Sequence, residues 1–191
     1  DHGNAPSGAG YEYVVVPATT STAMGALAAD YTNAATTPYE VLQRNTTAHV
    51  VQWKPDGRIG YALFRTNSLA AAVTNAGPLR AVNQPCLIMT QPTNALLWLT
   101  VVNPDLNLIN NVSSPTNVDV TLAGKWSIAA GPTNATILSG TASATVVRCQ
   151  TVHGLPEEVL LAPGGKVTPV LTSLTATAIY QGQTLADSSL S

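Results

Sequence analysis

The sequence predicts an all-β protein built as one or more antiparallel β-sandwiches, with one short helix near residues 21–31. Short segments rich in β-branched and aromatic residues alternate between apolar and polar positions, as half-buried strands do. Turn signals such as Lys54-Pro55-Asp56-Gly57 and Ala123-Gly124-Lys125 separate these segments. Only 9% of the 191 residues are charged, well under the usual quarter or so. The polar remainder is largely Thr, Ser, Asn and Gln.

The elements follow one another along the chain with one break in the strand pattern. In the segment TTSTAMGALAADY, a Ser/Thr start precedes Met24, Leu27 and Tyr31 at helical spacing. We expect this helix to lie across a sheet with those three side chains facing inward. Strands are predicted at residues 11–16, 40–43, 48–53, 59–64, 79–82, 86–91, 96–102, 118–122, 126–129, 142–148 and 159–161.

A composition shift at residues 69–78, LAAAVTNAGP, predicts a boundary between two β regions. The first, residues 1–78, would carry the helix and the strands around it. The second, residues 79–162, would be a compact small sandwich. Pro169 and Gly182 interrupt the alternation of the tail at 163–191, which predicts a terminal strand or a loose end.

Composition also bears on partners and compartment. With a net charge of −2 and no block of Lys or Arg, the sequence shows no basic patch that would bind nucleic acid or a membrane surface. No apolar run approaches the roughly 18 residues of a membrane helix. The polar start at Asp1 has no leader and suggests a processed or excised chain. Sequons at Asn45, Asn111 and Asn134 favour a secreted glycoprotein.

The two cysteines, Cys86 and Cys149, complete the argument for secretion. A secreted chain with two cysteines usually pairs them, so a disulfide is predicted, and two buried free thiols are the alternative. Neither cysteine has zinc-site spacing, and His2, His49 and His153 lie far apart in the sequence. No metal or other cofactor is therefore expected.

No catalytic arrangement is visible in the sequence. His49 is predicted to be a half-exposed residue of a strand. Glu157 and Glu158 are adjacent, so on a strand their carboxylates would point to opposite faces and could not act as a pair. Sugar binding needs an aromatic platform, and the candidates are Trp53 and Trp126, which stand beside turns. Trp98, inside ALLWLTVV, is predicted to pack in the core.

The opening stretch DHGNAPSGAGYEYVVVP resembles a pattern of the hyaluronate/chondroitin/xanthan polysaccharide lyases, through His2, Gly3, Pro6, Tyr11, Tyr13 and Pro17 in order. TTSTAMGALAADY sits where that family has a short helix. YEVLQRNTTAHVVQW, GYALFRTNS, QPCLIMTQPTNALLWLTVVNPD and VDVTLAGKW are similar to its later strands. The resemblance runs from residue 1 to 126 and on to about 162.

That resemblance implies the C-terminal portion of such a lyase, namely the end of the central β-supersandwich plus the C-terminal β domain. The family's catalytic Asn, His, Tyr and Arg lie on an α/α toroid, so this chain would be non-catalytic and support substrate binding. The strand at 11–16 would pair with strands upstream of Asp1, or the exposed edge would bind a separate catalytic polypeptide or a second copy. The alternatives are a free-standing lectin on the same framework and a plain structural module.

Overall fold

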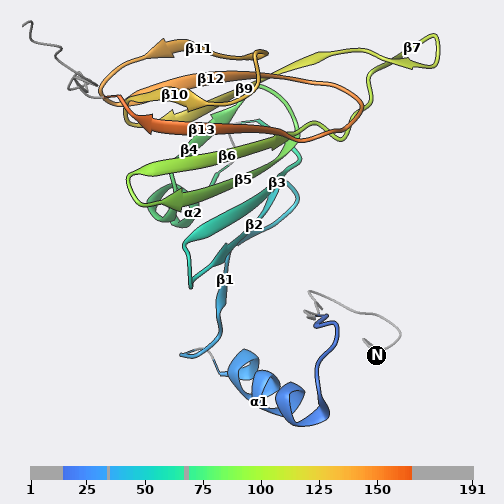
Figure 1. The fold of residues 1–191 in the computed structure, drawn as a ribbon, viewed down its shortest axis with the longest axis vertical. Coiled ribbons are helices and arrows are strands. Elements are labelled where there is room, and N and C mark those ends of the chain that lie inside the picture. Colours follow the sequence, from blue (N-terminus) through green and yellow to red (C-terminus); the bar gives the residue numbers. More distant parts are fainter. Residues whose placement is uncertain (1–14, 34, 67–68, 165–191) are drawn as a thin grey trace, which may run out of the picture.

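The computed structural model describes residues 15–33, 35–66 and 69–164. Two antiparallel sheets face each other as an open sandwich (Figure 1). The seven-stranded sheet has the order β1-β2-β3-β5-β6-β13-β10. Its strands are β1 (Tyr39–Arg44), β2 (Ala48–Trp53), β3 (Arg58–Leu63), β5 (Cys86–Thr93), β6 (Leu96–Val102), β13 (Glu157–Pro163) and β10 (Trp126–Ala130).

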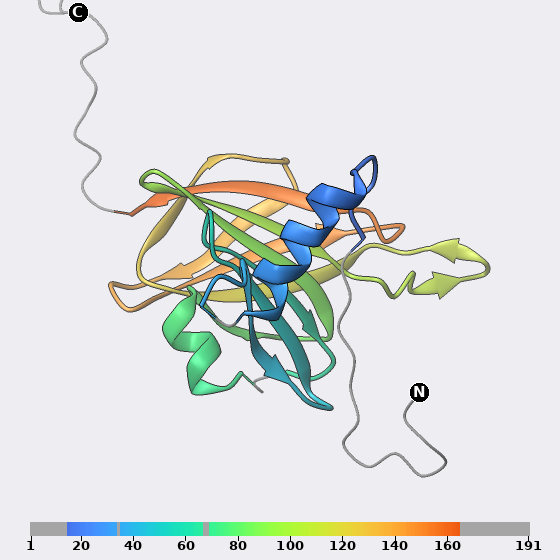
Figure 2. The same ribbon diagram turned by 90° about the horizontal axis from the view of Figure 1, so that it is seen from below.

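The second sheet has four strands in the order β11-β12-β9-β4. These strands are β11 (Ala135–Gly140), β12 (Ala144–Thr151), β9 (Thr116–Ala123) and β4 (Leu79–Val82). A small hairpin of β7 (Leu108–Ile109) and β8 (Val112–Ser113) projects from one end of the sandwich (Figures 1 and 2). The predicted all-β antiparallel class is confirmed.

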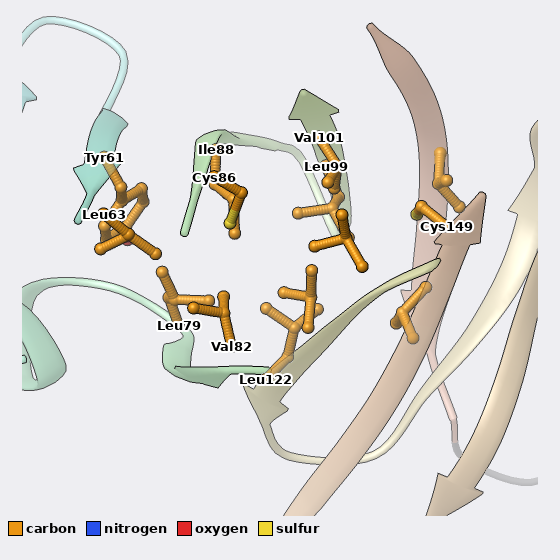
Figure 3. Packing of buried hydrophobic residues seen from close by; sticks show 14 of the residues in the cluster. Tyr61, Leu63, Leu79, Val82, Cys86, Ile88, Leu99, Val101, Leu122 and Cys149 are labelled. Carbon is orange, nitrogen blue, oxygen red and sulfur yellow. The ribbon is translucent and has the colours of Figure 1, made fainter. Parts of the chain in front are cut away.

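The core lies between the two sheets and follows from the alternation of the strands. In β6 the side chains of Leu97, Leu99 and Val101 point inward, and in β9 those of Val118 and Val120 do the same. All five are at most 4% exposed. Figure 3 shows side chains from both sheets meeting in this layer. Burial of this apolar layer is the main force that holds the sheets together.

Helix α1 (Ser21–Thr32) forms at the predicted place, but it does not lie across a sheet. Its N-terminus is capped by Thr20, whose Oγ1 accepts a hydrogen bond from Ala23 N at 3.2 Å. None of its residues is buried, so the inward packing predicted for Met24, Leu27 and Tyr31 is wrong. Figure 1 shows α1 beyond the β1 edge of the large sheet. A mixed pattern with no clean apolar stripe explains why the helix finds no face to cover.

The chain between β3 and β4 forms a second short helix, α2 (Ala71–Ala76), which places a fully buried Val73 in the core. The predicted boundary near residue 78 follows this helix. Strand β3 before it and β5 after it pair side by side, for example Tyr61 with Ile88. The division into two regions stays a prediction.

Some expectations fall outside the described residues. Of the first predicted strand, only Val15 and Val16 are described, and they are not in a strand. His2 and residues 165–191 of the predicted tail are not described. Neither described helix is long and apolar enough to cross a membrane.

Candidate functional site

The titratable residues considered from the sequence do not come together. The ring of His49 packs edge-on against Phe64, with centroids 5.1 Å apart. His153 lies in a turn with φ 59°, and its backbone N–H donates to Ser113 Oγ at 3.0 Å. Glu157 pairs with Val101 and Glu158 with Thr100, so the two carboxylates point to opposite faces of β13. Within the described ranges, no cluster of three His, Cys, Asp or Glu side chains is suited to a metal ion.

Trp126, one of the two predicted sugar platforms, lines a cleft at one end of the sandwich. The turn before it is made by Gly124 at φ 81°, a conformation that favours glycine. The indole Nε1–H donates to Ala123 O at 2.7 Å, and the backbone N–H of Trp126 donates to the hydroxyl of the buried Thr145 at 2.9 Å. These bonds fix the orientation of the ring.

The cleft beside Trp126 has a volume of about 330 Å³, and its walls are mainly apolar with several polar groups among them. Arg80 is its charged lining residue, and its Nη1 donates to Gly77 O at 2.7 Å and to Leu79 O at 3.0 Å. The carbonyl bonds hold one nitrogen of the guanidinium while the residue stays exposed. Amide and hydroxyl groups line the same cleft, from Thr74, Asn75, Thr90 and Asn94. An aromatic ring, a cation and two side-chain amides together fit an acidic sugar.

Trp53, the other predicted platform, lies on a different surface. It ends β2 and pairs with Tyr39 on one side and Arg58 on the other. Its side chain alternates with the buried Val50 and so points to the outer face of the seven-stranded sheet, half-buried. The Arg58 guanidinium is bound by Asp56, and this bond holds the pKa of that carboxyl below its usual range. The two predicted tryptophans therefore do not form one site.

Trp98 is another residue whose predicted place was wrong. Its neighbours Leu97 and Leu99 are buried, whereas Trp98 is 37% exposed on the outer face of β6. It borders a shallow hollow of about 210 Å³ lined by Met89, Gln91, Trp98, Thr100 and Glu158. The run ALLWLTVV is apolar at nearly every position, so it contains no alternation that could have separated the two faces.

A third and larger hollow, of about 520 Å³, lies between the end of α1 and β1. Tyr31 and Tyr39 stand in its wall with ring centroids 5.6 Å apart. Glu40 and Lys54 give it charges of both signs. Because one wall is the exposed helix α1, this hollow is less firmly built than the Trp126 cleft.

Cys86 and Cys149 are two buried free thiols, so the predicted disulfide is not formed in the structure. They lie on β5 and β12, which belong to different sheets. Figure 3 shows other core side chains between them. Burial raises the pKa of both thiols to about 12, with the charges of Glu157 and Asp119 adding to the effect at Cys149. Both groups are therefore protonated and unreactive at neutral pH.

The three sequons differ in geometry. Asn45 and Asn111 are exposed in the tight turns of the β1–β2 and β7–β8 hairpins. Asn134 is half-buried, and its amide nitrogen donates to Gln150 O at 2.7 Å. That bond would have to break before a glycan could be attached there. Glycosylation at the three sites stays a prediction.

Comparison with known proteins finds related sequences, although no family model matches the chain. It is 27% identical over 164 residues to a chondroitin sulfate ABC endolyase of Proteus vulgaris, covering 85% of this chain and 15% of the enzyme. It is 29% identical over 187 residues to a chondroitin sulfate ABC exolyase of Bacteroides thetaiotaomicron, covering 84% and 18%. The Proteus vulgaris exolyase is 36% identical over 107 residues, covering 56% and 9%.

Solved structures share the fold. A chondroitin AC lyase of Streptomyces coelicolor matches with a TM-score of 0.62 and 17% identity, over 85% of this chain and 19% of the enzyme. A Paenibacillus xanthan lyase matches with a TM-score of 0.57 and 15% identity, over 78% and 13%. The chain thus spans less than a fifth of the length of each of these relatives. The resemblance seen in the sequence is confirmed: the chain is related in sequence to chondroitin sulfate ABC lyases, shares the fold of chondroitin AC and xanthan lyases, and is consistent with the C-terminal β portion of a polysaccharide lyase.

Proposed function

We propose that this chain is the non-catalytic β portion of a secreted, extracellular polysaccharide lyase and supports the binding of a uronic-acid polysaccharide. Joined to an α/α toroid, it would take part in β-elimination. That reaction needs a group that neutralises the uronate carboxylate, a base, and an acid for the leaving oxygen. The described residues bring no such set together, so the catalytic groups would come from the toroid.

The Trp126 cleft is the observation that carries the proposal. The indole donates a hydrogen bond to Ala123 O and the backbone of Trp126 donates one to Thr145, so the residue is held in place, which suits a platform for a sugar ring. Arg80 supplies a positive charge in the same cleft for a carboxylate or sulfate group, and none of the described residues that line the cleft is acidic. The chondroitin AC lyase of Streptomyces coelicolor, which shares this fold, has been solved in complex with chondroitin sulphate.

Binding of a chondroitin sulfate hexasaccharide to the 191-residue chain tests the cleft, measured by titration calorimetry. Trp126→Ala and Arg80→Gln should each weaken binding about tenfold, which corresponds to about 1.4 kcal/mol. Lys54→Gln is the matched control, because it removes one positive charge from the hollow beside α1. Equal binding by Arg80→Gln and Lys54→Gln would show that the cleft does not hold the acidic sugar.

The partner of this chain is tested by its mass after purification from the natural source, native and then denatured. Strands β1 and β10 end the seven-stranded sheet, and unpaired edges bind other strands readily. A larger polypeptide that travels with the chain and yields unsaturated uronate products would support the lyase. A chain that is alone or self-associated and binds glycans would support the lectin, which the same cleft equally suits.

A further inference from the structure

An exposed tryptophan, Trp98, lies on the outer face of the seven-stranded sheet and does not contribute to the core between the two sheets. Trp98 points away from Leu97 and Leu99, which fill the inner face of the same strand. It pairs across the sheet with Gln91 on β5 and Leu160 on β13. A large aromatic side chain that is 37% exposed and set in a hollow favours contact with a ligand over a packing role.

The polar groups around Trp98 are not used by the fold. Gln91, Thr100 and Glu158 surround the hollow together with Met89. Met89, Thr100 and Glu158 form one cross-strand row, and Gln91 and Trp98 belong to the next. Within the described part of the chain, the side chains of Gln91, Thr100 and Glu158 make no hydrogen bond to another protein group. An amide, a hydroxyl and a carboxylate therefore remain available to a ligand.

We propose that this hollow is a second sugar-binding site, separate from the Trp126 cleft, and that it takes an uncharged, hydroxyl-rich sugar. The indole would cover the apolar face of a pyranose, while Gln91, Thr100 and Glu158 exchange hydrogen bonds with its hydroxyls. Glu158 is the charged lining residue, and a carboxylate in the wall of the hollow repels a uronate or a sulfate. The charge of the hollow is thus opposite to that of the cleft that holds Arg80.

The site extends across the sheet toward Trp53. Ile59 of β3 pairs with Thr90 of β5, so the next residues on these antiparallel strands, Arg58 and Gln91, also lie opposite each other. Arg58 pairs with Trp53, and Gln91 pairs with Trp98. The four residues therefore form one row across the sheet. Three strand spacings place the Cα atoms of Trp53 and Trp98 roughly 14 Å apart. In the neighbouring row, Gly60 leaves open space, since nothing lies within 4 Å of a Cβ built there. A longer glycan can therefore cross β3 at Gly60 on its way from Trp98 to Trp53.

The experiment uses the 191-residue chain and neutral hexasaccharides of glucose, mannose, xylose and galactose, titrated by calorimetry up to millimolar concentration. We expect at least one to bind, and Trp98→Ala to raise its Kd about tenfold or more, the usual scale for loss of an aromatic anchor. Trp98→Tyr should keep part of the affinity. Trp53→Ala should weaken hexasaccharides and spare disaccharides. Leu87→Ala is the matched control, because Leu87 is 43% exposed on the same face.

Two further variants separate this site from the Trp126 cleft. Trp126→Ala should leave neutral binding unchanged, and Glu158→Lys should let the hollow accept a chondroitin hexasaccharide even in the Trp126→Ala background. Absence of neutral binding, or equal affinity of wild type and Trp98→Ala, would overturn the proposal. So would protection of Trp98 from acrylamide quenching in a longer natural polypeptide, because a protein segment would then cover the face.

Discussion

Replacing Gly77 with alanine should destabilise the sandwich through overpacking. Gly77 has an extended backbone, with φ −138°, so the substitution causes no dihedral strain. The new methyl group would overlap the Tyr61 hydroxyl and lie 2.7 Å from Ile59 Cδ1. Tyr61 and Ile59 are only 2% and 1% exposed and have little room to move. Overpacking of this kind costs about 1–3 kcal/mol, or roughly 2–4 °C of Tm for each kcal/mol in a chain of this size.

Urea unfolding followed by circular dichroism measures the loss, and Gly60→Ala is the matched control. Gly60 is a strand glycine whose added Cβ would meet nothing within 4 Å. Tyr61→Phe removes the overlapping hydroxyl, together with its 3.4 Å hydrogen bond to Thr90. In that background Gly77→Ala should cost less, although the contact with Ile59 remains. Equal midpoints for Gly77→Ala and Gly60→Ala, or no coupling to Tyr61→Phe, would refute the steric argument.

The remaining predictions concern the thiols and the exposed helix. Cys86 and Cys149 should resist a thiol reagent at pH 8 in the native protein and both react after unfolding, as two titrated thiols, whereas a disulfide would give none. Because their folded pKa is about 12 and an unfolded thiol titrates near about 8.5, the unfolded state loses protons first. The free energy of unfolding should therefore fall between about pH 8.5 and 12, and less so in a Cys86→Ala, Cys149→Ala variant. Gly25→Ala should raise the helicity of α1, where a new Cβ meets nothing, by about 1 kcal/mol of local stability, yet leave the urea midpoint of the sandwich unchanged.

The strands bounded by turn residues were the predictable ones. Strands β2, β4 and β6 occupy the predicted residues 48–53, 79–82 and 96–102, and Pro, Gly or Asn residues flank each of them. Strand β11 was missed because it is an edge strand with only Ala135 buried, so its sequence lacks a strong apolar period. Helix α2 was missed because it buries a single residue, Val73. A short element with one anchor gives the sequence little periodic signal.

The candidate sites were predictable only in part. Trp126 stands next to a turn, and that position alone made it a sugar candidate. Arg80 could not be predicted from the sequence as part of this cleft. It lies near Trp126 only because β4 and α2 pack beside the β5–β6 turn. Trp98 was assigned to the core because both faces of β6 are apolar. Gln91, Thr100 and Glu158 lie around Trp98 because of the register in which β5, β6 and β13 pair. That register could not be deduced from the sequence of any one strand.

The position of β13 has a consequence for how the chain folds. Strand β6 pairs with β5 through a tight turn, but its other neighbour is β13, so that Leu99 meets Val159. Pairing between such distant segments is slow, because a long loop must close before any contact forms. We expect the β2–β3 and β5–β6 hairpins to form early and β13 to insert last. During synthesis, the β6 edge that later pairs with β13 would thus stay unpaired until nearly the whole described chain has left the ribosome. In that interval the unpaired edge is most prone to aggregation, and a chaperone would protect it most.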